Sequence, residues 1–166
     1  MTFVRGEASG LVHVPAGDGP AHWLVGDTYI VKASGASTGG ALGLIEASIP
    51  PGSGPAPHRH THEDEALYLL AGSLEVQVGD EIAHATAGDF AFLPRGTLHS
   101  FRNAGVDAAR ALIIITPGGF ERFFAEAGAP AQAGVPARPP GAADLERILA
   151  VAPQYGVELS PPPPPP

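Results

Sequence analysis

The sequence of 166 residues contains no cysteine, which excludes disulfide bonds, thiolate metal ligands and cysteine nucleophiles. It contains one lysine, Lys32, and no basic run, and its net charge of −8 argues against nucleic acid or anionic membrane surfaces as partners. No apolar run approaches the roughly 20 residues of a membrane-spanning helix, and residues 1–7 lack the apolar core of a signal peptide. We therefore expect a cytoplasmic protein.

Apolar residues make up 44% of the chain, which at this length suits one domain with a sizeable core. Short apolar runs separated by Gly, Pro and Asp turns indicate many short strands, as in an all-β sandwich or barrel. We predict strands near residues 23–25, 28–33, 42–49, 56–60, 65–70, 73–78, 81–86, 89–93, 98–103 and 109–116.

The composition changes after Pro117, where phenylalanines begin to recur at helical spacing. Residues 120–127 are predicted to form a helix that packs its phenylalanines on the barrel, or one that also covers the barrel mouth and shields a site. A second short helix is predicted at 142–150. The expected layout is an N-terminal arm (1–21), a barrel (22–118), a helical extension (119–160) and a proline-rich tail (161–166).

Two spaced motifs carry most of the chemical information. They read Gly52-x5-His58-x-His60-x4-Glu65-x6-Gly72 and Gly88-x5-Pro94-x-Gly96-x2-His99-x3-Asn103, with fifteen residues between them. Gly72 is expected to close a hairpin, because tight turns often need a residue that tolerates positive φ.

The motif residues that can ligate a metal are His58, His60, Glu65 and His99. Side chains alternate along a strand, so His58 and His60 share one face while Arg59 points away. Three nitrogens and one oxygen can hold one divalent transition metal and still leave coordination positions open. Iron, manganese, cobalt, nickel, copper and zinc all suit this set. His62 matches no motif position, and we expect it to face solvent or to support the ligands from behind.

These motifs resemble the two signature motifs of the cupin family at every fixed position. The resemblance implies the cupin double-stranded β-helix, a jelly-roll barrel, here with short C-terminal helices. It also implies a homodimer, the common state of cupins. Segments 58–68, 88–96 and 117–124, and more faintly 153–157, further resemble quercetinase-like (quercetin 2,3-dioxygenase-type) single-domain cupins.

The quercetinase-like resemblance implies a ring-opening flavonol dioxygenase. In such an enzyme a divalent metal binds the ionised flavonol, dioxygen adds and carbon monoxide leaves. His58, His60, Glu65 and His99 would then be the ligands. Glu65 would also be the catalytic residue that takes the proton of the substrate hydroxyl.

Strand alternation also predicts the surroundings of the metal. Leu67 and Leu69 should face inward with Glu65, and Phe101 with His99. Phe90 and Phe92 should share one face, which we expect to be the interior. An apolar and aromatic lining suits a small apolar or aromatic organic substrate. Because strand parity places no arginine or lysine among the inward positions, it does not support a phosphosugar.

Three functions remain open at this point. The first is a metal-dependent dioxygenase that acts on a phenolic or enolisable substrate. The second uses the same site for oxygen-independent proton transfer, as an isomerase, decarboxylase or aromatic cyclase. The third is a cupin that binds a small molecule without catalysis. Turnover without oxygen separates the second from the first, and an intact bound ligand would favour the third.

Overall fold

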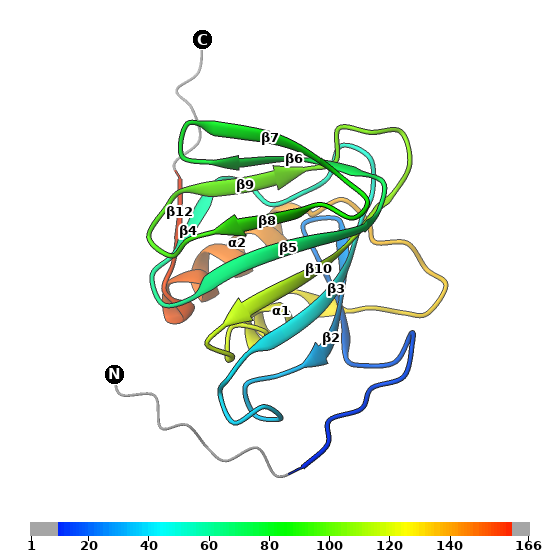
Figure 1. Ribbon diagram of the computed structural model, residues 1–166, viewed down its shortest axis with the longest axis vertical. Coiled ribbons are helices and arrows are strands. Elements are labelled where there is room, and N and C mark those ends of the chain that lie inside the picture. Colours follow the sequence, from blue (N-terminus) through cyan, green and yellow to red (C-terminus); the bar gives the residue numbers. More distant parts are fainter. Residues whose placement is uncertain (1–9, 161–166) are drawn as a thin grey trace.

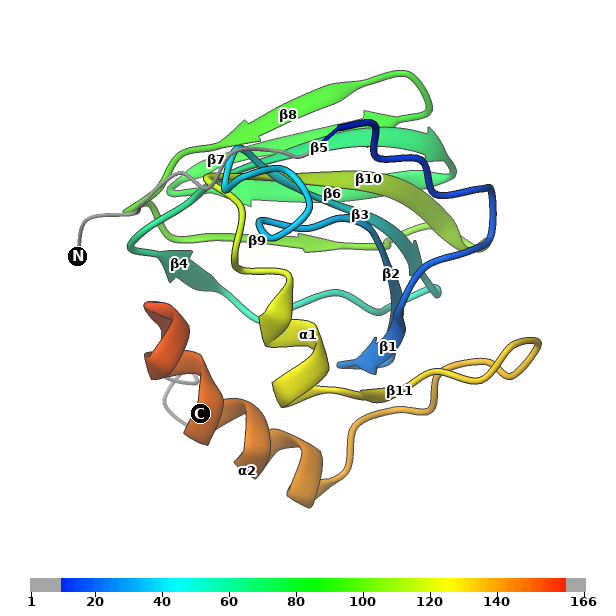
Figure 2. The same ribbon diagram turned by 90° about the horizontal axis from the view of Figure 1, so that it is seen from below.

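A computed structural model describes residues 10–160 as two antiparallel sheets that face each other and enclose the core. Figure 1 shows the strands crossing the molecule, and Figure 2 shows the helices on one side of them. This arrangement is the double-stranded β-helix that the sequence predicts.

The larger sheet has seven strands in the order β11-β1-β2-β3-β10-β5-β8. Their bounds are β1 Ala21–Leu24, β2 Asp27–Ala33, β3 Gly43–Ile49, β5 Asp64–Ala71, β8 Phe90–Leu93, β10 Ala109–Thr116 and β11 Ala129–Pro130.

The smaller sheet has five strands in the order β12-β4-β9-β6-β7. Their bounds are β4 His58–His60, β6 Ser73–Val78, β7 Glu81–Thr86, β9 His99–Arg102 and β12 Val157–Leu159.

The core follows from alternation along the central strands. In β3, Ile45, Ala47 and Ile49 are fully buried, and the residues between them are partly exposed. Strand β10 pairs with β3 so that Ile113 lies opposite Ile45, which adds a second row of buried side chains. Each buried isoleucine contributes about 1.5–3 kcal/mol to folding through removal of apolar surface from water.

Two motif residues have structural rather than chemical roles. Gly72 has φ +72°, and a Cβ there would lie 2.8 Å from the Cα of Ala109, so both conformation and space require glycine. Asn103 is fully buried, and its side-chain amide donates hydrogen bonds to the carbonyls of Ile49 and Asp107, each at 2.8 Å. These contacts hold together the loops at one end of the barrel.

The C-terminal part adds three short helices, α1 Arg122–Ala127, α2 Ala142–Val151 and the 3-10 helix η1 Ala152–Tyr155. Helix α1 is too short to be stable alone, and its stability comes from burying Phe123, Phe124 and Ala127. Figure 2 shows α1 and α2 next to each other on one side of the barrel, near β1 and β4. No helix within residues 10–160 is both long and apolar enough to cross a membrane.

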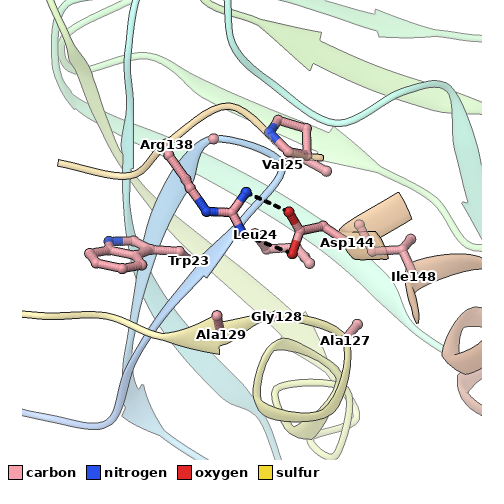
Figure 3. Close-up of a pocket in the computed structure, with 11 residues that line it drawn as sticks. Trp23, Leu24, Val25, Ala127, Gly128, Ala129, Arg138, Asp144 and Ile148 are labelled. Carbon is pink, nitrogen blue, oxygen red and sulfur yellow. Dashed lines mark hydrogen bonds and ion pairs between the residues drawn. The ribbon is translucent and has the colours of Figure 1, made fainter. Parts of the chain in front are cut away.

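The segment between α1 and α2 is fixed by an ion pair. Arg138 Nη1 lies 2.7 Å from Asp144 Oδ2 in the first turn of α2, and Figure 3 shows this pair spanning a small cavity beside Leu24 and Ile148. The cavity of about 30 Å³ holds about one or two water molecules.

The ten strands and the two helices predicted from the sequence are confirmed, with ends that differ by a residue or two. Strands β11 and β12 were not predicted. Strand β12 is the more important of the two for the site, because it extends the smaller sheet beside β4 and places Val157 opposite His60. Residues 1–9 of the predicted arm and the predicted tail at 161–166 lie outside the described residues.

Candidate metal centre

The structure brings the four candidate ligands together in the barrel interior. His58 and His60 come from β4, Glu65 from β5 and His99 from β9, and all four are buried. Each offers a ligand atom, and these atoms lie within 4.8 Å of one another. His58 and His99 are direct cross-strand partners, so their backbone pairing fixes the spacing of their rings. Arg59 is exposed, as alternation predicts.

Backbone carbonyls orient two of the rings. The Nδ1 atom of His58 lies 2.8 Å from the carbonyl oxygen of Ala56, and that of His99 lies 3.1 Å from the carbonyl oxygen of Thr97. A carbonyl only accepts hydrogen bonds, so each Nδ1 carries the proton and each Nε2 keeps a free lone pair. In this tautomer Nε2 is the nitrogen that can ligate a metal.

Two carboxylates flank His60. Its Nε2 lies 3.2 Å from Glu65 Oε2, and its Nδ1 lies 3.7 Å from the buried carboxylate of Glu63. A carboxylate behind a ligating imidazole orients the ring and raises its basicity. The sequence motif does not assign Glu63 this place. The available signal was a carboxylate three residues beyond a ligand, beside two other acidic residues.

The electrostatics of the three groups differ. Burial lowers the pKa of His58 to about 4, because nearby His99 and His60 add to desolvation and outweigh the attraction of Glu65. Burial also acts to lower the pKa of His60, but hydrogen bonds and charge from Glu63 and Glu65 outweigh it and raise the pKa to about 9. Burial acts to raise the pKa of Glu65, yet His60 and His99 hold it well below its usual range.

The cluster fits a divalent metal on its own geometry. The Nε2 atom of His99 is buried, lies 3.4 Å from Glu65 Oε2 and lacks a well-directed hydrogen bond. A buried polar atom without a partner is costly, and a cation coordinated by the three imidazoles and the carboxylate would satisfy it. The set has the chemistry of a transition-metal site rather than of a calcium or magnesium site, because nitrogen ligands dominate.

The cluster opens into a cavity of about 720 Å³ between the barrel and the C-terminal helices. His58, His60 and Glu65 line one part of it. The rest of the wall is mostly apolar and comes from β1, β2, β9, β10, α1, α2 and β12, with Tyr29 and Ser160 as further polar residues. No lysine or arginine of residues 10–160 lines this cavity.

Phe120 links the cavity wall to the cluster. Its ring meets the ring of His60 edge-on, with centroids 4.4 Å apart, and stacks on Phe123 at 5.0 Å. The buried carboxylate of Glu121 accepts hydrogen bonds from the backbone of Gly35 and Gly119, which fixes the turn before α1. Of the two interpretations of the first helix, both hold: it packs on the barrel, and its phenylalanines cover the site.

The predicted pocket residues divide into three groups. Phe101 lines the cavity. Leu67 and Leu69 face inward and are buried, but they lie in the core and do not reach the cavity wall. The prediction for Phe90 and Phe92 is wrong, because they are 62% and 54% exposed on the outer face of β8.

Strand register explains the error. Leu93 pairs with Glu65, and Ala91 pairs with Leu67, so Ala91 and Leu93 share the inward face with these residues. Phe90 and Phe92 do share one face, as predicted, but it is the outer one. The prediction assumed that large aromatic residues choose the interior, whereas the pairing with β5 decides the face.

His62 is exposed and lies outside the cluster, which agrees with one of its two interpretations. The catalytic role of Glu65 stays a prediction, as does the homodimer.

Comparison with known proteins gives the same fold family. Residues 45–115 match the family described as Cupin domain. The chain is 35% identical over 100 residues to the tetracenomycin polyketide synthase protein TcmJ of Streptomyces glaucescens, covering 59% of this chain and 66% of that protein. It is 28% identical over 129 residues to quercetin 2,3-dioxygenase of Bacillus subtilis, covering 76% of this chain and 37% of that protein. The chain therefore spans just under two thirds of one relative and little more than a third of the other.

Solved structures support the architecture. An RmlC-like cupin from Shewanella frigidimarina aligns with a TM-score of 0.56 at 18% identity, over 66% of this chain and 95% of that one. A predicted oxalate decarboxylase from Thermotoga maritima aligns with a TM-score of 0.57 at 23% identity, over 62% of this chain and 96% of that one. At these identities the likeness concerns the fold alone. Residues 45–115 therefore form a cupin domain, and the double-stranded β-helix around the motif residues agrees with this assignment.

Proposed function

We propose that this protein is a metal-dependent dioxygenase that acts on a flavonol-like or other phenolic, enolisable substrate. The observation that carries the proposal is the direct opening of a three-histidine, one-carboxylate cluster into a large apolar cavity. Its volume of about 720 Å³ lies within the roughly 300–1,000 Å³ typical of small-molecule sites. The similarity to quercetin 2,3-dioxygenase supports the substrate class.

In this proposal the cluster residues bind the metal and transfer a proton, and the phenylalanines of the cavity wall position the substrate. His58, His60, Glu65 and His99 would hold the metal, which when bound supplies Lewis-acid stabilisation of an ionised substrate oxygen. Glu65 accepts the proton of that hydroxyl, because its carboxylate lies on the cavity wall within the ligand cluster. Phe120, Phe123 and Phe124 contact the flat rings of the substrate and exclude water.

For a flavonol the reaction balances with dioxygen as the oxidant. Two carbon–carbon bonds break on either side of the carbon that carried the ionised hydroxyl, and that carbon leaves with its oxygen as carbon monoxide. Both atoms of dioxygen enter the ring-opened product through two new carbon–oxygen bonds.

A second candidate is favoured by the polyketide synthase proteins among the relatives. These are TcmJ and, at 30% identity over 90 residues, CurC of Streptomyces cyaneus. The same cavity and carboxylate would then serve an oxygen-independent cyclisation of a polyketide-like, enolisable chain. Proton transfer at Glu65 is common to both reactions, so the requirement for oxygen distinguishes them.

The test combines metal analysis with turnover in air and under argon. We expect the purified protein to contain close to one divalent transition metal per chain, and to consume oxygen with release of carbon monoxide when given flavonols. Turnover of a polyketide-like substrate under argon would favour the cyclase instead. If the metal-containing protein converts neither flavonols nor polyketide-like substrates and the bound ligand is recovered intact, both reactions are refuted.

A further inference from the structure

One polar side chain on the cavity wall has no part in the metal cluster or in the proposed reaction. Tyr29 in β2 is only 2% exposed, and it lines the cavity beside Phe124, with ring centroids 4.5 Å apart. A phenylalanine would fill the same space without a hydroxyl to satisfy, so the hydroxyl calls for an explanation.

The direction of the hydrogen bond made by Tyr29 is fixed. Its hydroxyl lies 2.9 Å from Oδ2 of Asp27, and a carboxylate only accepts, so the tyrosine donates its proton. Burial raises the pKa of Tyr29 well above its ordinary value, and the charge of Asp27 adds to this effect, so the hydroxyl stays protonated. The phenol oxygen therefore retains lone pairs, and it can only accept a hydrogen bond from a ligand.

The burial of Asp27 lowers the stability of the folded state. This residue is fully buried, and its second oxygen, Oδ1, accepts no well-directed hydrogen bond, because the nearby hydroxyl of Ser53 donates to the carbonyl of Val25. The adjacent hairpin adds strain, because Val25 has φ +49°, a conformation unfavourable for a β-branched residue. Val25 also lines the cavity. Buried unpaired groups and strained backbone cluster at functional sites more often than in passive cores.

We propose that Tyr29, oriented by Asp27, is a second polar anchor that accepts a hydrogen bond from a ligand hydroxyl other than the one at the metal cluster. This inference rests on the proposed function and narrows its substrate class. The ligand is a polyphenol with at least two hydroxyl groups, one for the cluster and one for Tyr29. An apolar molecule with a single hydroxyl would fill the cavity but leave the tyrosine oxygen without a donor, which costs affinity.

The experiment measures binding of three flavones to the purified, metal-containing protein under argon, by calorimetry. The reference ligand is 3-hydroxyflavone, and the two others carry one more hydroxyl, at position 7 or at position 4′. We expect at least one of these two to bind about tenfold more tightly than the reference, the scale of one buried hydrogen bond. In Tyr29→Phe this preference should vanish, while the affinity for 3-hydroxyflavone should stay within about twofold of the wild-type value.

Two further variants separate positioning from packing. Asp27→Asn keeps an oxygen that can accept from Tyr29, so it should preserve most of the preference, whereas Asp27→Ala should lose it. The matched control is Tyr155→Phe, which removes a tyrosine hydroxyl that bonds to Glu126 and lies off the cavity wall. It should leave the preference unchanged. Metal content and melting temperature, measured for every variant, show whether the fold is intact.

The outcomes distinguish this inference from the proposed function. Equal affinity of the wild type for all three flavones would overturn the anchor alone, and this result needs no variant. Persistence of the preference in Tyr29→Phe would also overturn it. Failure of all three flavones to bind would overturn both the anchor and the proposed substrate class. A hydroxyl preference without turnover in air would support the anchor and remove the dioxygenase reaction.

Discussion

The metal cluster and the apolar wall of the cavity are built in different ways. The cluster comes from three strands, of which β4 and β9 are paired directly, and backbone carbonyls orient the rings of His58 and His99. The apolar wall includes Phe120, Phe123 and Phe124, which come from one later segment and are held by ring packing. Strand register therefore sets the positions of the cluster residues, and it tolerates little change. We expect the three phenylalanines to set ligand selectivity, and this part of the wall is easier to alter.

The largest expected effect comes from breaking the cluster itself. Replacing both His60 and His99 with alanine should remove most of the bound metal, because the pair would supply two of the four protein ligands of the proposed site. Metal content per chain, measured by mass spectrometry after dialysis, checks this. Full occupancy in the double variant would show that the metal binds elsewhere. Replacement of the exposed His62 with alanine is the matched control, and it should leave the metal content unchanged.

The next effect concerns Glu65 and separates its two roles. Glu65→Gln keeps the size of the side chain and an oxygen that can ligate, but it removes the basic charge. If the carboxylate accepts the substrate proton, turnover per bound metal should fall roughly 10²-fold or more while the three histidines still hold substantial metal. Normal turnover per bound metal in this variant would leave Glu65 as a ligand only.

Two phenylalanine variants compare the contribution to stability of the cavity wall with that of the outer face of β8. Phe120→Ala should lower the free energy of unfolding by about 2–4 kcal/mol, because the buried ring packs on His60 and Phe123. Phe90→Ala should cost less than about 1 kcal/mol, because that ring is 62% exposed. Urea unfolding of both variants measures the difference. Equal losses would mean that Phe120 does not pack as described.

The buried carboxylate of Asp27 predicts a pH dependence of stability. Burial raises its pKa to about 6, although the nearby hydroxyl of Ser53 and the hydrogen bond from Tyr29 act to lower the pKa. Between its ordinary value of 3.8 and about 6 the folded state keeps the proton that the unfolded state has lost. This carboxyl therefore destabilises the fold progressively as pH rises through that window, by about 3 kcal/mol in all.

Asp27→Asn cannot ionise and should escape this loss. The difference in unfolding free energy between the variant and the wild type should shift in favour of the variant by about 1–3 kcal/mol from pH 4 to pH 7. Urea titrations at both pH values measure it, and only the change between them is interpreted, since the substitution alters packing equally at both. A difference that stays constant with pH would contradict the raised pKa.

The smallest effect is expected at the C-terminus. Removing residues 161–166 should leave metal content and melting temperature nearly unchanged, because we expect from the sequence that a tail of six prolines adds little to the core. Ser160 should be kept, since its backbone N–H donates to the carbonyl of Pro57 at 2.9 Å and the residue lines the cavity. A loss of several degrees in melting temperature would contradict the prediction.

The sequence alone determined the fold and the four residues of the cluster. Turn glycines and alternating apolar residues specify short strands, and a fixed spacing of histidines and a glutamate on such strands brings them to one face. These are local properties, and local patterns are what a sequence shows directly. The place of Glu63 behind His60 could be predicted only in part. Its spacing from His60 is visible in the sequence, but its burial depends on the tertiary structure.

Only the tertiary structure decided what surrounds the cluster. The outward position of Phe90 and Phe92 depends on the register of β8 against β5, and a shift by one residue would reverse it. The contact of Phe120 with His60, the pairing of β12 with β4, and the place of Tyr29 on the cavity wall each join segments far apart in the chain. The energy of such contacts comes from packing and burial, which depend on how whole elements meet and leave no periodic trace in the sequence.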